Sequence, residues 1–310
     1  MIISIAGPTA SGKTALSLKV AELLGGPERV EIVSADAMQL YRGMDIGTAK
    51  LPVAQRGGIV HHQIDVLDIH DEASVAAYQR YARQDVADIQ ARGKIPLVVG
   101  GSGLYLSALL DELDFPGHDP QIRSELEEIA AREGLAPLVA ELAIKDPESH
   151  ATIDLANPRR VIRALEVIRL TGGLYTPRFP RHTNYYTDHV AFAVNRENEL
   201  LHPAIMGRAE SMMDHGLLEE TRVLLERGLR DTPTASRATG YAEAIAVLDG
   251  HMTREEAVAS IAQATRRLAK KQRTWLRADP RLTWLDLSKG DVQASAEELV
   301  TAVRARGALQ

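Results

Sequence analysis

The chain has 310 residues, which is enough for one large domain or for two of ordinary size. With 45% hydrophobic and 25% charged residues its composition is that of a globular protein, and the lack of cysteine excludes disulfides, cysteine-ligated zinc and thiol catalysis. The net charge of −6 excludes a uniformly basic nucleic-acid-binding protein.

Short apolar runs alternate with helical patterns through the first third of the chain. Three runs predict buried strands: residues 1–6, 30–36 and 95–101. Two amphipathic patterns predict helices over residues 12–24 and 74–92. This alternation predicts an α/β fold in which a parallel sheet is flanked by helices.

Neither a membrane anchor nor an export signal is expected. No stretch reaches the roughly 18–20 apolar residues that cross a bilayer. The run at 1–6 is too short, and lacks the basic start, to be a signal peptide. Together with the lack of cysteine, this predicts a cytoplasmic protein with no membrane partner.

The pattern changes after about residue 116. Residues 119–170 read as helical throughout, and residues 174–189 read as a loop because they lack any period and contain prolines. A late strand is predicted at 189–194, and helices follow to the C-terminus. We therefore expect two parts, a core formed by residues 1–115 and 189–310 and a mainly helical insertion over 116–188.

Residues 7–14 read GPTASGKT and fit the P-loop template, placed between a predicted strand and a predicted helix. In such a loop backbone N–H groups point at phosphate oxygens, Lys13 supplies positive charge, and the Thr14 hydroxyl reaches Mg²⁺. A diphosphate or triphosphate is expected to bind the whole loop: Gly7, Pro8, Thr9, Ala10, Ser11, Gly12, Lys13 and Thr14.

The acid that P-loop hydrolases carry at the end of a later strand is missing, because 95–101 ends in glycines. Asp36 closes the strand at 30–36 instead. Since the carboxyl ends of neighbouring parallel strands meet at one crevice, we expect Asp36 to face the P-loop, where it can accept a proton or hold Mg²⁺ through water. A helix-cap or loop role for Asp36 fits the spacing equally well. The glycine turn at 100–105 lies at the same edge and predicts a ligand contact.

Two segments concentrate basic residues. Residues 265–277 contain six basic residues, no acid and Trp275, and residues 157–169 contain four more. One such run is usually a solvated helix face, but two in a net-acidic chain predict a surface for RNA phosphates.

His61 and His62, followed by Asp65, suggest a metal site. Residues adjacent along a strand point to opposite sides, so shared metal ligation is awkward. We expect a structural or hydrogen-bonding role for the pair.

In this order, the motifs resemble those of the bacterial tRNA dimethylallyltransferases (isopentenyltransferases). The resemblance covers nearly the whole chain, and its longest, most specific part is SADAMQLYRGMDIGTAK at 34–50. The other matching motifs are GPTASGKT (7–14), HHQID (61–65), VGGSGLY (99–105), NPRRVIRALEV (157–167), GYAE (240–243), TRRLAKKQRTWLR (265–277) and the spacing Arg208…Met212…Gly216-Leu217…Glu220.

The resemblance implies a P-loop NTPase-like core and a specific reaction. The dimethylallyl group of dimethylallyl diphosphate passes to the N6 amine of the adenosine just 3′ of the anticodon, in tRNAs reading codons that begin with U. Mg²⁺ is the implied cofactor, diphosphate the leaving group, and a monomer the implied state. ATP binding to the P-loop would look the same in the sequence.

The resemblance also implies roles for individual residues. Asp36 is the expected general base, Thr14 the metal-linked residue, with Asp36 reaching the metal through water, and Lys13 and Arg237 the charges on the diphosphate. The implied tRNA contacts are Asp36, Ala37, Met38, Gln39, Ser102, Arg123, Pro158, Arg159, Arg160, Val161 and Ile162. The basic pattern adds Arg266 and Arg267.

Three alternatives stay open. A P-loop small-molecule kinase could use 265–277 as a lid, a prenyltransferase could act on free AMP or ADP, and a nucleotide switch or RNA-binding module could lack catalysis. The insertion at 116–188 argues against the second, and intact Lys13, Thr14 and Asp36 argue against the third. Four positions depart from the family's usual residues, and they affect expected tRNA contacts rather than the chemistry: Ala37, Leu51, Asn195 and Ala242.

Overall fold

The computed structural model describes residues 1–175, 182–289 and 291–306. The chain divides into two compact units, residues 1–112 with 182–310 and residues 113–181, and each is described by itself. The sequence placed this division at 116–188. Residues 182–188 instead group with the core, where the Tyr185 N–H donates to the Leu110 carbonyl across 2.9 Å.

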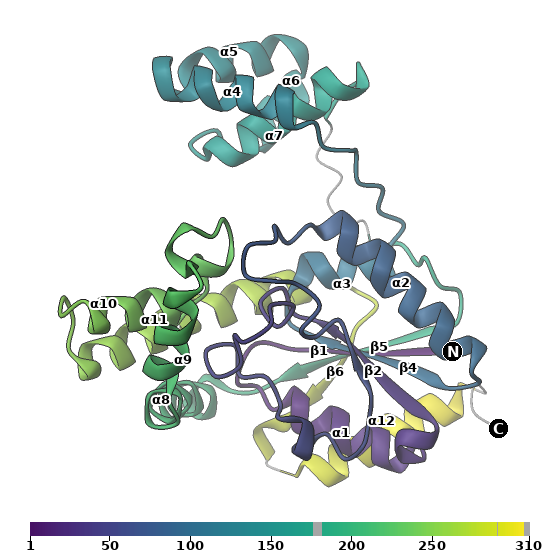
Figure 1. Cartoon of the computed structure of the whole chain (residues 1–310). Helices are drawn as coiled ribbons and strands as arrows, with labels where there is room; N and C mark the ends of the chain where they lie inside the picture. Colours follow the sequence, from purple (N-terminus) through teal and green to yellow (C-terminus); the bar gives the residue numbers. More distant parts are fainter. Residues whose placement is uncertain (176–181, 290, 307–310) are drawn as a thin grey trace. The chain divides into compact units, whose positions relative to one another are not determined.

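The first unit is built on a six-stranded sheet in the order β3-β2-β4-β1-β5-β6, with every strand pairing parallel (Figure 1). The strands are β1 (Ile2–Ala6), β2 (Val30–Ala35), β3 (His61–His62), β4 (Ile95–Gly100), β5 (His189–Asn195) and β6 (Thr283–Asp286). β1 and β2 are buried along their whole length because helices cover both faces of the sheet. The predicted α/β class is confirmed.

Two pairs of helices cover the sheet, with α1 and α12 on one face and α2 and α3 on the other (Figure 1). Their bounds are α1 (Lys13–Leu23), α2 (Val75–Ala91), α3 (Gly103–Leu110) and α12 (Val292–Ala305). The predicted helices at 12–24 and 74–92 are α1 and α2. The Ser74 hydroxyl accepts the N–H of Ala77 and so fixes the start of α2.

A second apolar core lies beside the sheet, where four further helices pack together. They are α8 (Asn198–Asp214), α9 (Leu217–Glu226), α10 (Tyr241–Leu248) and α11 (Arg254–Arg277). Its largest fully buried side chains include Tyr41, Met44 and Tyr241, so the loop after β2 belongs to this core. Across the described ranges no helix is long and apolar enough to cross a membrane.

The second unit is a helical cluster of α4 (Pro120–Glu133), α5 (Ala136–Lys145), α6 (Pro147–Thr152) and α7 (Pro158–Thr171). Its core includes Leu126, Leu142, Val161 and Leu165. The Asn157 side chain accepts the N–H of Arg159 at the start of α7. Helices were predicted here throughout, whereas the predicted loop at 174–189 falls partly outside the described residues.

The chain leaves and re-enters the first unit at one place. The Glu112 N–H donates to the Thr183 hydroxyl across 2.8 Å, so the outgoing and returning segments are joined. The guanidinium of Arg281 pairs with the fully buried Asp111 at 2.6 Å and also donates to the Thr183 carbonyl. Arg281 therefore fastens both segments to the core.

Candidate active site

Residues 7–12 form a tight turn between β1 and α1. Gly12 has φ +97°, a left-handed conformation that side chains disfavour, and it directly precedes the first residue of α1. No acidic residue lies in the first turn of α1, so the N–H groups at the helix start keep their positive potential. The loop has the conformation of an anion site, as the P-loop motif predicts.

Two distant helices hold this loop in place. The Thr9 N–H donates to the Gln272 side chain on α11 at 2.9 Å, and Arg208 on α8 donates to the Thr9 hydroxyl at 3.1 Å. The hydroxyl of Ser11 is buried and has no hydrogen-bond partner among the described residues. A buried polar group of this kind usually has a partner, and a bound phosphate oxygen would supply one.

Lys13, Asp36 and Arg208 lie within electrostatic reach of one another. Burial lowers the pKa of Lys13 to about 8, the Asp36 carboxylate opposes that shift, and the Arg208 guanidinium adds to it. Burial also lowers the pKa of Arg208, against the same carboxylate. Asp36 lies near the P-loop lysine as expected. A second cation, Arg208, lies near the same carboxylate.

The backbone itself fixes Asp36 at the end of β2. One oxygen of its carboxylate accepts the Met38 N–H at 3.0 Å, and the next N–H, that of Ala37, donates to the Ser102 hydroxyl at 3.3 Å. Ser102 therefore supports the backbone of the segment that carries Asp36. The side chain of Gln39 lies inward and donates to the Thr48 carbonyl at 3.2 Å, so Gln39 holds the loop together.

The glycine turn after β4 is explained by close packing of backbone. A Cβ at Gly100 would lie 2.2 Å from the Ala35 carbonyl oxygen, closer than any real contact. The absence of an acid at the end of this strand therefore has a steric cause. In the structure Ser102 of this turn acts on the backbone next to Asp36, and the ligand contact of the turn stays a prediction.

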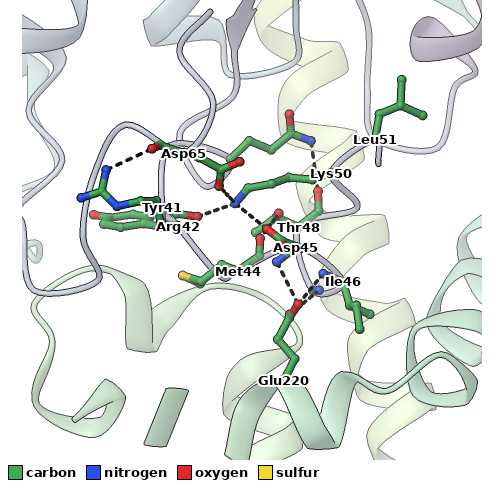
Figure 2. Close-up of polar contacts among 12 residues, drawn as sticks. Tyr41, Arg42, Met44, Asp45, Ile46, Thr48, Lys50, Leu51, Asp65 and Glu220 are labelled. Atoms are coloured by element: carbon green, nitrogen blue, oxygen red, sulfur yellow. Dashed lines mark hydrogen bonds and ion pairs between the residues drawn. The ribbon is translucent and has the colours of Figure 1, made fainter. Parts of the chain in front are cut away.

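A buried lysine closes the loop that carries the family's longest motif (Figure 2). The Lys50 ammonium pairs with Asp45 at 2.8 Å, and it also contacts the Asp65 carboxylate and the Tyr41 carbonyl. With two carboxylates around it, the buried charge is compensated. Lys50 thereby joins Tyr41 and Asp45, at the start of residues 41–65, to Asp65 at their end.

Glu220, at the first turn of α9, holds the tip of the same loop (Figure 2). Its carboxylate accepts the N–H groups of Asp45, Ile46 and Gly47 at 2.9, 2.8 and 3.1 Å. It also accepts the Tyr241 hydroxyl at 2.6 Å. One carboxylate therefore fixes three consecutive residues of the loop against the helical core.

A cavity of about 100 Å³ opens between the P-loop, this loop, α8 and α11. The polar groups around it include Thr9, Asp36, Arg208 and Gln272. Its apolar wall includes Met38, Ile205, Ala209, Met212, Ala238, Ile261 and Leu268. The cavity is thus cationic at the P-loop and mainly apolar elsewhere, with a carboxylate at its edge and the hydroxyl residues Thr48, Thr239 and Thr265 also in its lining.

Arg237, expected on the diphosphate, lies in the 3₁₀ turn Ala235–Arg237 with an exposed side chain, and it does not line the cavity. Arg208 contacts the P-loop instead. Sequence reasoning gave Arg208 no role, although it begins the motif spacing at 208–220. That spacing is the feature of the sequence that could have pointed to Arg208.

The basic residues of α11 share its turns with residues that line the cavity, but they do not line it themselves. Arg266 and Arg267 lie between Thr265 and Leu268, both of which line it. Arg267 is exposed and Arg266 partly so. Because residues one or two positions apart do not share a helix face, Arg266 and Arg267 lie on faces of α11 other than the one that lines the cavity.

The basic run of α7 is divided between surface and core. Pro158, Arg159 and Arg160 are exposed, whereas the side chains of Val161 and Ile162 are buried in the second unit's core and offer no side-chain surface to RNA. Three further arginines of this unit are held in ion pairs with neighbouring carboxylates: Arg123 with Glu127, Arg163 with Glu166 and Arg169 with Glu141. The exposed positive charge at this end of α7 is concentrated on Arg159 and Arg160.

The histidine pair has the predicted hydrogen-bonding role. His62 contacts the carboxylates of Glu31 at 2.8 Å and Asp85 at 3.4 Å, which raise its pKa. His61 bonds to the Ile59 carbonyl at 2.9 Å. Among the residues that the structure describes, no group of three His, Asp or Glu side chains forms a metal site.

Comparison with known proteins identifies the family. The model of the IPP transferase family matches residues 39–279. The chain is 47% identical over 301 residues to a tRNA dimethylallyltransferase of Salinispora arenicola, covering 97% of this chain and 86% of that one. It also resembles the crystal structure of a tRNA isopentenylpyrophosphate transferase from Bacillus halodurans, with a TM-score of 0.71, 36% identity and coverage of 99% and 97%.

A eukaryotic dimethylallyltransferase acting on tRNA gives a TM-score of 0.83 at 27% identity, covering 97% of this chain and 78% of that one. Because these structural matches cover 97% or more of this chain, they extend over the P-loop core as well as the helical insertion. This chain belongs to the IPP transferase family.

Proposed function

We propose that this chain is a tRNA dimethylallyltransferase, which transfers the dimethylallyl group of dimethylallyl diphosphate to N6 of the adenosine 3′ of the anticodon. The observation that carries the proposal is the cavity's composition. A cationic P-loop meets an apolar wall, with Asp36 at their boundary. A phosphate donor with a hydrocarbon tail matches both halves.

The P-loop end would stabilise the leaving group. As the bond between C1 of the donor and its bridging oxygen breaks, negative charge grows on the diphosphate. With the diphosphate in the P-loop, Lys13, Arg208 and the N–H groups at the start of α1 would lie where that charge develops, and their proximity to one another supports this role. Preorganised charges of this kind lower the barrier because they need no rearrangement during the reaction.

Asp36 would act on the nucleophile. As N6 of adenine forms its bond to C1, one proton must leave the nitrogen, and the carboxylate accepts it. The Met38 N–H holds one Asp36 oxygen, which leaves the other for the amine. The adenine must leave its stack to reach this point, and in an anticodon loop its unpaired state makes that step cheaper.

The residues present fit Mg²⁺. This ion usually takes one or two protein oxygens and completes its octahedron with phosphate oxygens and water. The exposed Thr14 side chain at the start of α1 offers a hydroxyl ligand, and Asp36 offers a carboxylate through water. The ion would neutralise diphosphate charge when bound.

Incubation with labelled dimethylallyl diphosphate, Mg²⁺ and unmodified tRNA tests the proposal. Nucleoside analysis should show N6-dimethylallyladenosine, and Asp36→Asn should give none. Parallel arms with AMP, ADP, and ATP plus small-molecule acceptors cover the alternatives. Label on free AMP but not on tRNA, or phosphate transfer from ATP without prenyl transfer, would overturn it.

A further inference from the structure

The two long helices beside the cavity define its ends. α8 passes beside the P-loop: Arg196 just before it donates to the Ala10 carbonyl at 3.3 Å, and Arg208 within it donates to the Thr9 hydroxyl at 3.1 Å. α11 runs antiparallel to α8, because Arg273 near its C-terminal end donates to the Asn198 side chain at the start of α8, and the neighbouring Gln272 holds Thr9. Ile261, eleven residues earlier, lies roughly 16 Å further along the axis of α11.

Met212 lies at the end remote from the P-loop. Arg208 reaches the P-loop through its bond to Thr9, and Met212 follows four residues later, about 6 Å or one turn further from the start of the helix. Both side chains line the cavity, since residues four apart share a helix face.

The remote end is bounded by apolar side chains that differ in burial. Ile261 and Ala238 are buried and packed into the second core, whereas Met212 is only partly buried. Methionine is unbranched and adapts its shape to a ligand. Met212 is therefore the side chain that can fit closely around a short hydrocarbon while Ile261 and Ala238 stay fixed.

We propose that Met212 limits the length of the prenyl chain that the site accepts. The proposal rests on the proposed function for the class of donor and extends it to specificity. Met212 lies about one helical turn beyond Arg208 along α8 and lines the same cavity, which is small, at about 100 Å³, so a chain anchored by its diphosphate at Thr9 and Arg208 has little room before it meets the Met212 side chain. That space suits a five-carbon chain, and a ten-carbon chain would have to displace the methionine.

The test compares dimethylallyl diphosphate and geranyl diphosphate as donors to unmodified tRNA. The wild type should prefer the five-carbon donor in kcat/KM, and Met212→Ala should raise the ten-carbon to five-carbon ratio by about 10-fold or more. Met212→Trp, which fills the space further, should instead raise the KM for the five-carbon donor. The mass of the modified nucleoside identifies which chain is transferred.

Met213→Ala is the matched control. Met213 adjoins Met212 on α8 and is buried in the same core, but it does not line the cavity. Its loss should lower stability without changing the donor ratio. An unchanged ratio in Met212→Ala, or an equal change in Met213→Ala, would overturn the proposal.

Calorimetric binding of the two diphosphates separates this inference from the proposed function. If the wild type transfers no prenyl group to tRNA, the proposed function fails. In that case the role of Met212 is still supported if Met212→Ala selectively gains affinity for the ten-carbon diphosphate. It is refuted if the ratio of affinities for the two diphosphates is the same in Met212→Ala as in the wild type.

Discussion

Arg208 donates a hydrogen bond to the Thr9 hydroxyl across 3.1 Å and so brings a cation from α8 into the P-loop. Arg208→Gln should lower kcat by about 100-fold to 1000-fold, because it removes charge from the place where the leaving diphosphate becomes more negative. Single-turnover assays with saturating donor measure the effect. Arg237→Gln in the same assay tests the arginine that the family resemblance implied. A kcat within twofold of wild type for Arg208→Gln would exclude this role.

Asp36→Asn should abolish transfer while leaving donor binding largely intact. The amide keeps the shape of the side chain but cannot accept the amine proton, which is worth about 100-fold to 10,000-fold in rate. Donor affinity by calorimetry and turnover with tRNA are the two measurements. Ala37→Ser, which changes the neighbouring residue to the one common in the family, is the control and should remain active. Normal turnover by Asp36→Asn would refute the general-base role.

Donor affinity should fall as pH rises above about 8. Burial lowers the pKa of Lys13 to about 8, so the ammonium is present below that pH and is lost above it. A bound diphosphate favours the charged form, so binding takes up a proton at high pH and weakens by up to about tenfold per pH unit. Calorimetry in buffers of different ionisation enthalpy detects the proton. Lys13→Arg, which stays charged, should bind with little dependence on pH between 7 and 9.5.

Glu220→Gln should destabilise the loop at 45–47 by about 1–3 kcal/mol, because a charged acceptor of three backbone N–H groups becomes a neutral one. Tyr241→Phe removes only the fourth partner and should cost about 1 kcal/mol. Urea unfolding gives both values. Equal losses in the two variants would show that the backbone contacts contribute nothing beyond the hydroxyl.

Charge reversal at Arg266 and Arg267, or at Arg159 and Arg160, should raise the apparent KM for tRNA and leave the KM for the donor unchanged. Each lost phosphate contact should also make the dependence of affinity on salt less steep. Reversal of Arg304 and Arg306, exposed at the end of α12, is the matched control. If neither pair changes the KM for tRNA, both runs are merely solvated helix faces.

Local sequence determined most of the sheet. β1, β2 and β4 are short apolar runs, buried on both faces, and such runs are visible without tertiary information. β6 was missed because it pairs on one side only, with β5, and buries Leu285 alone among its four residues. β3 is two residues long and has no pattern to detect.

The candidate site was predicted only in part, because a sequence shows local patterns but not contacts between distant segments. Lys13 and Asp36 follow strands of the sheet, so topology alone brings them together. Glu220 meets the loop at 45–47 across more than 170 residues of chain, and Arg208 meets Thr9 across 199. No local pattern reports such contacts. The motif at 34–50 is conspicuous in the sequence. Only the structure shows that Lys50 and Glu220 hold the loop that it forms.

The hydrogen bond between Glu112 and Thr183 makes residues 113–181 an excursion from one point of the core. Since its two ends already lie together and Arg281 holds both, a tight turn of a few residues would close the gap without stretching any strand. The donor cavity is lined entirely from the remaining residues. The architecture thus divides the chain into a first unit that contains every residue lining the cavity and a helical module joined to it at one place, so the module can change in length without changing the cavity lining.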